Sequence, residues 1–411
     1  MFTKYIQEGD RQRAVAKIYS QNEHTIKSSQ IDRDALWAIR KLQAEGFEAY
    51  IVGGAIRDLL LGRAPKDFDI ATSASPRQVQ KIFWNARIIG RRFRIVHLYF
   101  NHDKIIEVTT FRSDEENFEE GNNNIYGTIE QDSKRRDFSI NSLYYNPRNY
   151  QLVDFNNALE DFRKKRIRSL IPLSYSFTED PVRMIRAIKY HVTTGFDYER
   201  DVKKALKKNR GELEMVSTSR MTEEVNKILS SGCACEIFNE LKKFKMLAYI
   251  IPSYSIYIDF PEVEKALKEL DEYVRSSKKE GLPLEKSQMY FFLFRSLITL
   301  PFADSLNLDE KKKEVFRQLK IFLSPMTPPN YELERTASLI LQAMGYKAKV
   351  QKKAVAASSA RKKPGATLGR RSAAAEELSK SKRKKGGRGR NIVKEEVTIE
   401  NAKSLAESHD V

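Results

Sequence analysis

The sequence predicts an α+β protein in which a small head with a mixed β-sheet precedes an all-α neck and body and a disordered basic tail. Three observations support this prediction. Strand-like and helix-like apolar patterns alternate up to about residue 167, and afterwards apolar residues recur every three to four positions. Beyond residue 345 the chain is strongly basic and has almost no aromatic residues. A chain of 411 residues is long enough for two or three domains.

The head is expected to span residues 31–167, after a polar and weakly patterned segment, 1–30, that is predicted to be a loosely held leader. An amphipathic helix opens the head, with Leu36, Ile39 and Leu42 at helical spacing. The following strands and helices are predicted from alternating and helical apolar patterns. Strands are expected within 49–52, 68–72, 94–100 and 105–111, and helices within 56–62 and 75–83.

The neck, 168–235, and the body, 236–344, are predicted to be helical throughout. Helices are expected within 180–195, 222–232, 236–250, 260–274, 286–300 and 331–345. The most apolar run, 289–302, is too short for a membrane span and carries Arg295 in its middle, which favours a buried core helix. No association with a membrane is therefore expected.

The cysteine and histidine content argues against a zinc site. Cys233 and Cys235 form a lone C-A-C, which is neither a zinc pair nor a disulfide framework, and the five histidines have no metal-ligand spacing. No signal-peptide pattern opens the chain. These features are typical of an intracellular protein, and we expect a cytoplasmic location.

The tail, 345–411, carries most of the net charge of +18. Sixteen Lys and Arg residues stand between 345 and 390, against two acids. Such a segment repels itself and cannot form a core, so it is expected to be disordered. A flexible polycation binds phosphate backbones without reading bases. Its candidate RNA-binding residues are Lys382, Arg383, Lys384 and Lys385; the alternative is a solvated tail that only increases solubility.

Two acids in the head, Asp67 and Asp69, are the candidate metal ligands. They lie one residue apart on a predicted strand and therefore point to the same face. Carboxylates this close repel each other unless a cation lies between them, and oxygen ligands suit Mg²⁺. Glu107, on a later strand, could add a third catalytic carboxylate to a two-metal cluster. The alternatives are solvated loop acids for the pair and an exposed strand residue for Glu107.

The stretch IVGGAIRD just before these acids suggests an anion site. Gly53 and Gly54 join a strand to a helix, which presents backbone N–H groups to an anion such as a triphosphate. Arg57 and Asp58 follow in the helix, and with Gly53 and Gly54 they form a candidate nucleotide-binding string.

Two further groups of polar residues could contact a nucleotide. Asp137 and Asn141 are four residues apart, on one face if helical, and could hold a ribose or support the metals. Arg136 could meet phosphate; the alternative for this segment is a charged surface helix.

The second group, Asp180, Arg183 and Arg186, recurs every three residues along one helical face and could meet a base edge. Alternatively, Asp180 only caps the helix that begins at Pro181.

Five motifs follow one another along the chain in this order: Gly53-Gly54, Arg57-Asp58, Asp67-x-Asp69, RRDFSIN and EDPVRMIRA. Through these motifs the chain resembles the class II nucleotidyltransferases of the polymerase-β superfamily. This class comprises tRNA CCA-adding enzymes and bacterial poly(A) polymerases. The resemblance covers about residues 31–235; the helical body fits loosely and the tail has no family signature beyond its charge. The resemblance implies a nucleotidyltransferase head, with Mg²⁺ bound by Asp67 and Asp69. Asp137 would be a functional acid, and the nucleotide-selecting motif would fall on Glu179, Asp180 and Arg183.

Within this family the chain most resembles the bacterial poly(A) polymerase branch. The segment IIGRRFRIVHLYF is similar to that branch, and Arg91, Arg92 and Arg94, expected on a strand, would suit RNA; a purely structural strand is the alternative. The resemblance implies template-independent addition of AMP from ATP to the 3′ ends of mRNA and other RNAs. Two Mg²⁺ ions, or Mn²⁺, would polarise the attacking 3′-hydroxyl and stabilise the leaving pyrophosphate. The alternatives are a tRNA CCA-adding enzyme and a non-catalytic RNA-binding protein.

Overall fold

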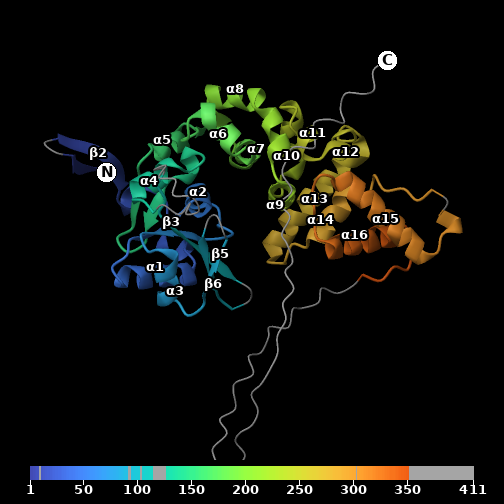
Figure 1. The fold of residues 1–411 in the computed structure, drawn as a ribbon, viewed down its shortest axis with the longest axis horizontal. Helices are drawn as coiled ribbons and strands as arrows, with labels where there is room; N and C mark the ends of the chain where they lie inside the picture. Colours follow the sequence, from blue (N-terminus) through green and yellow to red (C-terminus); the bar gives the residue numbers. More distant parts are fainter. Residues whose placement is uncertain (9–10, 91–93, 102–103, 114–125, 302, 351–411) are drawn as a thin grey trace, which may run out of the picture. The chain divides into compact units, whose positions relative to one another are not determined.

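The computed structural model describes residues 1–350 except 9–10, 91–93, 102–103, 114–125 and 302 (Figure 1). Most of the predicted tail therefore lies outside the described residues, as do Arg91 and Arg92 and the four tail residues expected to bind RNA. The described chain contains a sheet-based head followed by a largely helical neck and body. The predicted fold class is confirmed for this part of the chain.

The head is built on one nine-stranded sheet with the strand order β1-β2-β9-β8-β3-β4-β7-β6-β5. Strands β4 and β7 are parallel, and every other neighbouring pair in this sheet is antiparallel, so the sheet is mixed. The strands are β1 (Phe2–Glu8), β2 (Arg11–Tyr19), β3 (Ala49–Val52), β4 (Asp69–Thr72), β5 (Ala86–Ile89), β6 (Ile95–Tyr99), β7 (Ile105–Thr110), β8 (Tyr144–Asn146) and β9 (Gln151–Asp154).

Helices cover one face of this sheet along most of its width. They are α1 (Arg33–Ala44), α2 (Gly54–Leu60) and α3 (Pro76–Ile82), as the helical patterns predicted. Alternate strand residues such as Ile51, Ile70 and Ile106 pack against them in a continuous core. This core fixes the strands from which the polar residues of the opposite face project.

The opposite face is covered over only part of its width. A second apolar cluster contains Val52, Ala71, Tyr144 and Val153, and it is closed by Ile129 of α4 (Ile129–Lys134). This cluster lies over the β2-β9-β8-β3-β4 half of the sheet. The polar residues described below begin where it ends.

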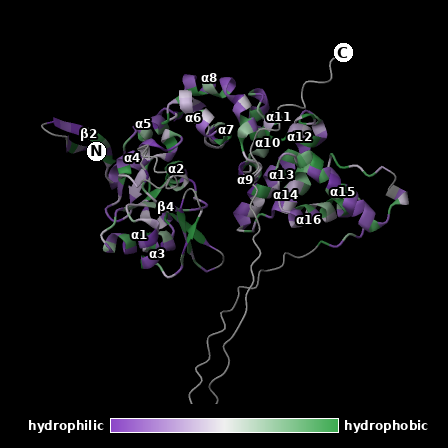
Figure 2. Ribbon diagram, viewed as in Figure 1, coloured by the Kyte–Doolittle hydropathy of each residue, from purple (hydrophilic) through white to green (hydrophobic). Residues whose placement is uncertain are grey.

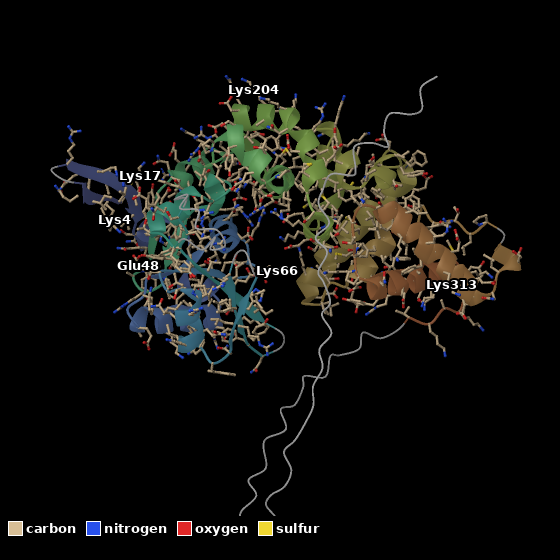
Figure 3. The ribbon with its side chains drawn as sticks, in the orientation of Figure 1. Lys4, Lys17, Glu48, Lys66, Lys204 and Lys313 are labelled. Atoms are coloured by element: carbon tan, nitrogen blue, oxygen red, sulfur yellow. The ribbon has the colours of Figure 1, made fainter. Side chains whose placement is uncertain are left out.

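The predicted loose leader is wrong, because Phe2–Glu8 and Arg11–Tyr19 form the paired strands β1 and β2. Strand β1 pairs antiparallel with β2, and β2 joins the sheet by pairing Lys17–Tyr19 with β9. Lys4 and Lys17 mark the two strands in Figure 3. The missed signal is Gly9-Asp10 between two strand-like runs, a spacing typical of a hairpin.

The predicted strand over residues 94–100 belongs to a second hairpin. Strand β5 pairs antiparallel with β6, and Gly90, with a φ of 88°, ends β5 in a conformation that favours glycine. Arg94 lies on the connection before β6 and is exposed. The expectation that Arg94 sits on a strand is therefore wrong.

The neck and body share one helical core, which also includes Phe138 and Ile140. Figure 2 shows hydrophobic and hydrophilic residues alternating along these helices, as expected for amphipathic packing. The helices after α4 are α5 (Ala158–Arg163), α6 (Leu173–Glu179), α7 (Val182–Thr194), α8 (Arg200–Lys208), α9 (Thr218–Leu229), α10 (Ala234–Lys243), α11 (Leu247–Ile250), α12 (Pro252–Ser255), α13 (Pro261–Glu280), α14 (Lys286–Phe294), α15 (Leu308–Leu323) and α16 (Asn330–Ala343). A short parallel pair, β10 (Arg166–Ile167) with β11 (Asp197–Tyr198), is the exception to an all-α neck.

The expectation of a buried core helix near residue 289 is confirmed. The first part of the apolar run, 289–294, lies in α14, whose Met289, Tyr290 and Leu293 are buried. Among the described residues, no helix combines the length and the apolar character that crossing a membrane requires. Cys233 and Cys235 form no disulfide, and burial raises the pKa of both thiols, which makes them weak nucleophiles.

Candidate active site

A cavity of about 610 Å³ gathers most of the predicted site residues. Its lining combines seven basic with five acidic side chains, so charged groups dominate it. The lining residues are Gly53, Gly54, Arg57, Asp69, Glu107, Arg135, Arg136, Asp137, Asn141, Asp180, Arg183, Arg186, Lys189, Tyr190, Glu224 and Lys227.

Two acids of the head, Asp69 and Glu107, lie side by side in this cavity. Asp69 is the first residue of β4, and it pairs in register with Glu107 on the parallel strand β7. Cross-strand partners project to the same face of a sheet. Burial, and then the nearby carboxylate of Glu107, raise the pKa of Asp69 to about 6. The two carboxylates thus form a site of concentrated negative charge.

Asp67 does not line this cavity, and the expectation that it projects from a strand beside Asp69 is wrong. Strand β3 ends at Val52, which pairs with Asp69, so residue 67 has no strand partner. The Asp67 side chain is 68% exposed, and its Oδ2 lies 3.7 Å from Nζ of Lys66. Lys66 is labelled in Figure 3. It borders a separate hollow of about 350 Å³ that also contains Lys104. Within the described ranges, no three His, Cys, Asp or Glu side chains are grouped closely enough to hold a metal ion.

Both glycines of the predicted pair line the cavity. Gly53 has a φ of 70°, and a Cβ built there would lie 3.8 Å from Oδ2 of Asp69 and 3.6 Å from Nη1 of Arg136. A side chain at this position would therefore be strained and would fill space beside the acid. Gly54 is the first residue of α2.

Arg57 is held in a fixed orientation by its neighbours. Its Nε and Nη2 donate to Oδ1 of Asp58 at 2.9 and 2.8 Å, and its Nη1 donates to Oδ1 of Asn141 at 3.0 Å. The guanidinium also lies 5.0 Å from the centre of the Tyr190 ring. Asp58 thus does not line the cavity itself but orients Arg57 within it.

The segment around Asp137 is not one continuous helix, which also excludes the alternative of a charged surface helix. Helix α4 ends at Lys134, and a short 3₁₀ helix, η3 (Ser139–Asn141), follows after a break. The expected proximity holds nevertheless, because Nδ2 of Asn141 donates to Oδ1 of Asp137 at 3.2 Å. Oδ2 of Asp137 pairs with Arg186 at 2.9 Å, which links the head to α7.

Helix α7 and the turn before it present the predicted series Asp180, Arg183 and Arg186 to the cavity. Asp180 is not a side-chain cap of this helix. Its Oδ2 accepts a hydrogen bond from Arg220 at 2.8 Å, whereas its Oδ1 is buried and has no hydrogen-bond partner among the described residues. Arg183 donates to the carbonyl of Ser176 at 2.9 Å.

Glu179, the last residue of α6, is not among the lining residues. It pairs with Arg183 and therefore acts on the cavity only through that arginine. The exposed Arg94 is absent from the lining as well.

Sequence reasoning missed an ion-pair group on α7 and α9 that also lines the cavity. Glu224 lies 2.9 Å from Lys227 and 3.3 Å from Lys189. These lysines lower the pKa of Glu224 although its burial opposes the shift. One signal was present, because the three-residue series from Asp180 to Arg186 continues to Lys189.

Comparison with known families identifies two regions of the chain. Residues 49–168 match a family described as "Poly A polymerase head domain", and residues 195–257 match one described as "Probable RNA and SrmB-binding site of polymerase A". The first match contains Gly53 and Gly54 and three of the five acids of the cavity, which are Asp69, Glu107 and Asp137. The second contains α9, which carries Glu224 and Lys227.

Individual proteins are similar over longer stretches. Poly(A) polymerase I of Haemophilus influenzae is 38% identical over 268 residues, which cover 60% of this chain and 59% of that protein. A CCA-adding enzyme of Geobacillus thermodenitrificans is 36% identical over 53% of this chain and 54% of its own length. The solved structure of the Bacillus stearothermophilus CCA-adding enzyme in complex with CTP is 26% identical, with a TM-score of 0.56 over 78% of this chain and 71% of that chain. The chain spans 59% to 66% of the length of the first poly(A) polymerases that it matches.

Proposed function

We propose that the chain is a polynucleotide adenylyltransferase, because it is similar to bacterial poly(A) polymerases and CCA-adding enzymes. It adds AMP from ATP to RNA 3′ ends without a template. The observation that carries this proposal is the cavity, in which a pair of carboxylates lies among basic side chains from both the head and the neck. Phosphoryl transfer requires positioning and charge stabilisation more than covalent chemistry, and this lining suits both.

The acid pair fits a divalent metal site. Asp69 and Glu107 offer the hard oxygen ligands that Mg²⁺ prefers, and their mutual repulsion is what a cation would relieve. We propose that these two residues hold Mg²⁺ or Mn²⁺, with Asp67 as a further ligand and Asp137 as a supporting acid. When bound, two ions would polarise the attacking hydroxyl and offset the charge of the leaving pyrophosphate.

The remaining lining residues would bind the nucleotide. Arg57 and Arg136 adjoin the glycine pair, where basic groups can contact the phosphates of ATP. The unpartnered Oδ1 of Asp180 can accept a hydrogen bond from the amino group of adenine, and Arg183 can donate to a ring nitrogen. These contacts would select the base without a template strand.

A tRNA CCA-adding enzyme is the second candidate, favoured by the similarity to the solved enzyme with CTP. Adenylyl transfer is preferred because the poly(A) polymerase match covers 60% of the chain, against 53% for the CCA-adding enzyme. The substrates we propose are mRNA and other RNAs in a bacterial cytoplasm, so the enzyme would take part in RNA polyadenylation. A match to a probable RNA-binding site supports RNA as a partner.

The test is to incubate the protein with Mg²⁺, a generic RNA bearing a 3′-hydroxyl and each nucleoside triphosphate separately, and then to measure product length. A long tail with ATP and poor extension with CTP are expected. Addition that stops after three nucleotides, requires CTP and needs a tRNA-like end would identify the CCA-adding activity instead. Binding of RNA without any addition would favour a non-catalytic RNA-binding protein.

A further inference from the structure

The strand register aligns one residue from each of the nine strands in a single row across the sheet. In strand order, the row contains Phe2, Ile18, Val153, Tyr144, Val52, Asp69, Glu107, His97 and Arg87. Its members share one face because directly paired residues project together. The row is apolar or aromatic up to Val52 and ionisable from Asp69 to Arg87.

The ionisable half of the row lies on an open surface. Helix α3 packs against the opposite face of these strands, where Val79 joins Val96 and Leu98 in the core. On the open face, Ile89 and Ile105 are 42% and 38% exposed, and the Glu107 side chain is 47% exposed. This open face leads directly from the acid pair to the outer edge of the sheet at β5.

Contacts connect the residues along this surface. Nε2 of His97 lies 3.4 Å from Oε1 of Glu107, and the His97 ring lies 6.1 Å from the ring of Tyr99, two residues farther along β6. The guanidinium of Arg87 lies 5.1 Å from the centre of the same Tyr99 ring. An acid, an imidazole, an aromatic ring and a guanidinium therefore follow one another outwards from the cavity.

We propose that the surface formed by Arg87, His97 and Tyr99, which we call the β5–β6 strip, binds the last nucleotides of the RNA whose 3′-hydroxyl enters the cavity. This inference rests on the proposed function. Arg87 can neutralise a backbone phosphate, and aromatic rings and guanidinium planes are surfaces on which bases stack. Strand spacing separates Asp69 from Arg87 by about 14 Å, which is about four stacked nucleotides. The cationic end of the strip thus lies where the backbone would pass while the terminal hydroxyl meets the acids.

Binding of a fluorescent generic RNA, measured by anisotropy at several salt concentrations without nucleotide, tests the strip directly. Arg87→Ala should weaken binding about tenfold, and should flatten the dependence of log K on log salt by about 0.7 for one lost phosphate contact. Arg87→Lys should keep the salt dependence of the natural protein. Arg77→Ala is the matched control, because it removes one exposed charge from α3, which packs on the other face.

In the transfer assay, Arg87→Ala should raise the KM for RNA without changing the KM for ATP. RNA with 4-thiouridine near its 3′ end should crosslink to peptides that contain Arg87 or Tyr99, which tests the strip in the natural sequence as well. The proposal that the strip binds RNA would be overturned if Arg87→Ala and Arg77→Ala had equal RNA affinity and salt dependence. Crosslinks only to other segments would overturn it as well. Weaker RNA binding by Arg87→Ala in a protein that transfers no AMP would support the strip while refuting the proposed function.

Discussion

The two halves of the row that crosses the sheet lie on one continuous series of paired strands but differ in chemistry and in exposure. From Ile18 to Val52 the side chains are buried in an apolar cluster closed by α4, whereas from Asp69 to Arg87 they lie at the cavity or on an open face. The change from apolar to ionisable side chains occurs between two directly paired residues, Val52 and Asp69. The difference teaches that the candidate site lies at the edge of a core. The packed half fixes the strands, and the open half leaves the face where we propose that the substrate binds.

Asp69→Asn tests the polar half and should have the largest effect. Loss of the proposed metal ligand should reduce kcat by about 10³-fold or more, while the folded state is retained because the new side chain has the same size. AMP transfer and thermal unfolding should be measured together. Asp201→Asn, an exposed acid on α8, is the control and should retain activity.

Asp67→Asn should be assayed beside it. A loss as large as that of Asp69→Asn is expected if the exposed Asp67 reaches the metals once they are bound. Near-normal turnover would remove Asp67 from the proposed ligand set.

Tyr144→Ala tests the apolar half and should mainly lower the free energy of unfolding. The ring is fully buried, so its removal should cost about 3–5 kcal/mol of unfolding free energy. Tyr144→Phe keeps the ring and loses only the hydroxyl contacts to Arg136 and Asp132, which should cost about 1–3 kcal/mol. Denaturant unfolding measures both, and equal losses for the two variants would contradict the packing role of the ring.

The pH dependence of stability tests Asp69, the residue at which the row changes from apolar to ionisable. The pKa of Asp69 is raised from 3.8 to about 6 in the folded protein. The folded state therefore holds this proton more tightly than the unfolded state does, which stabilises the fold fully below pH 3.8. This stabilisation is lost as the pH rises through about 6. The loss of unfolding free energy from this cause should reach up to about 3 kcal/mol. In EDTA, the Tm of the natural protein should fall relative to that of Asp69→Asn between pH 4 and 7. Parallel Tm curves would show that Asp69 is not perturbed.

Arg183→Ala tests a residue outside the row and should have the smallest effect. Both halves of the row stay intact, so turnover should change less than base choice. Loss of the proposed base-edge contact should reduce the expected preference for ATP over CTP by roughly 1–3 kcal/mol. Competition between the two nucleotides measures this preference, with Arg183→Lys as the conservative control. An unchanged ratio in a folded variant would mean that Arg183 only braces Ser176 and Glu179.

Local patterns were sufficient to predict much of this molecule. The strand before Gly53 and the helix that carries Arg183 and Arg186 follow from apolar periodicity, which acts over a few residues. The grouping of the glycines, Asp69 and Asp180 in one cavity was expected from their order in the chain and their resemblance to a family.

Features that depend on distant pairing were not predictable in the same way. Asp67 was expected on a strand, but the ladder with β3 begins only at Asp69. The alignment of His97 and Arg87 with Glu107 depends on register, which a shift of one residue would reverse. The pairing of Lys189 with Glu224 joins two helices that sequence alone does not bring together.

Because the cavity takes residues from Gly53 through to Lys227, its parts leave the ribosome at different times. The acids of β4 and β7 are synthesised well before α9, which supplies Glu224 and Lys227. A nascent or prematurely ended chain that stops before α9 carries the carboxylates but lacks these later residues. Completion of the cavity is thereby tied to translation of the neck, and short fragments of this protein cannot contain the whole site.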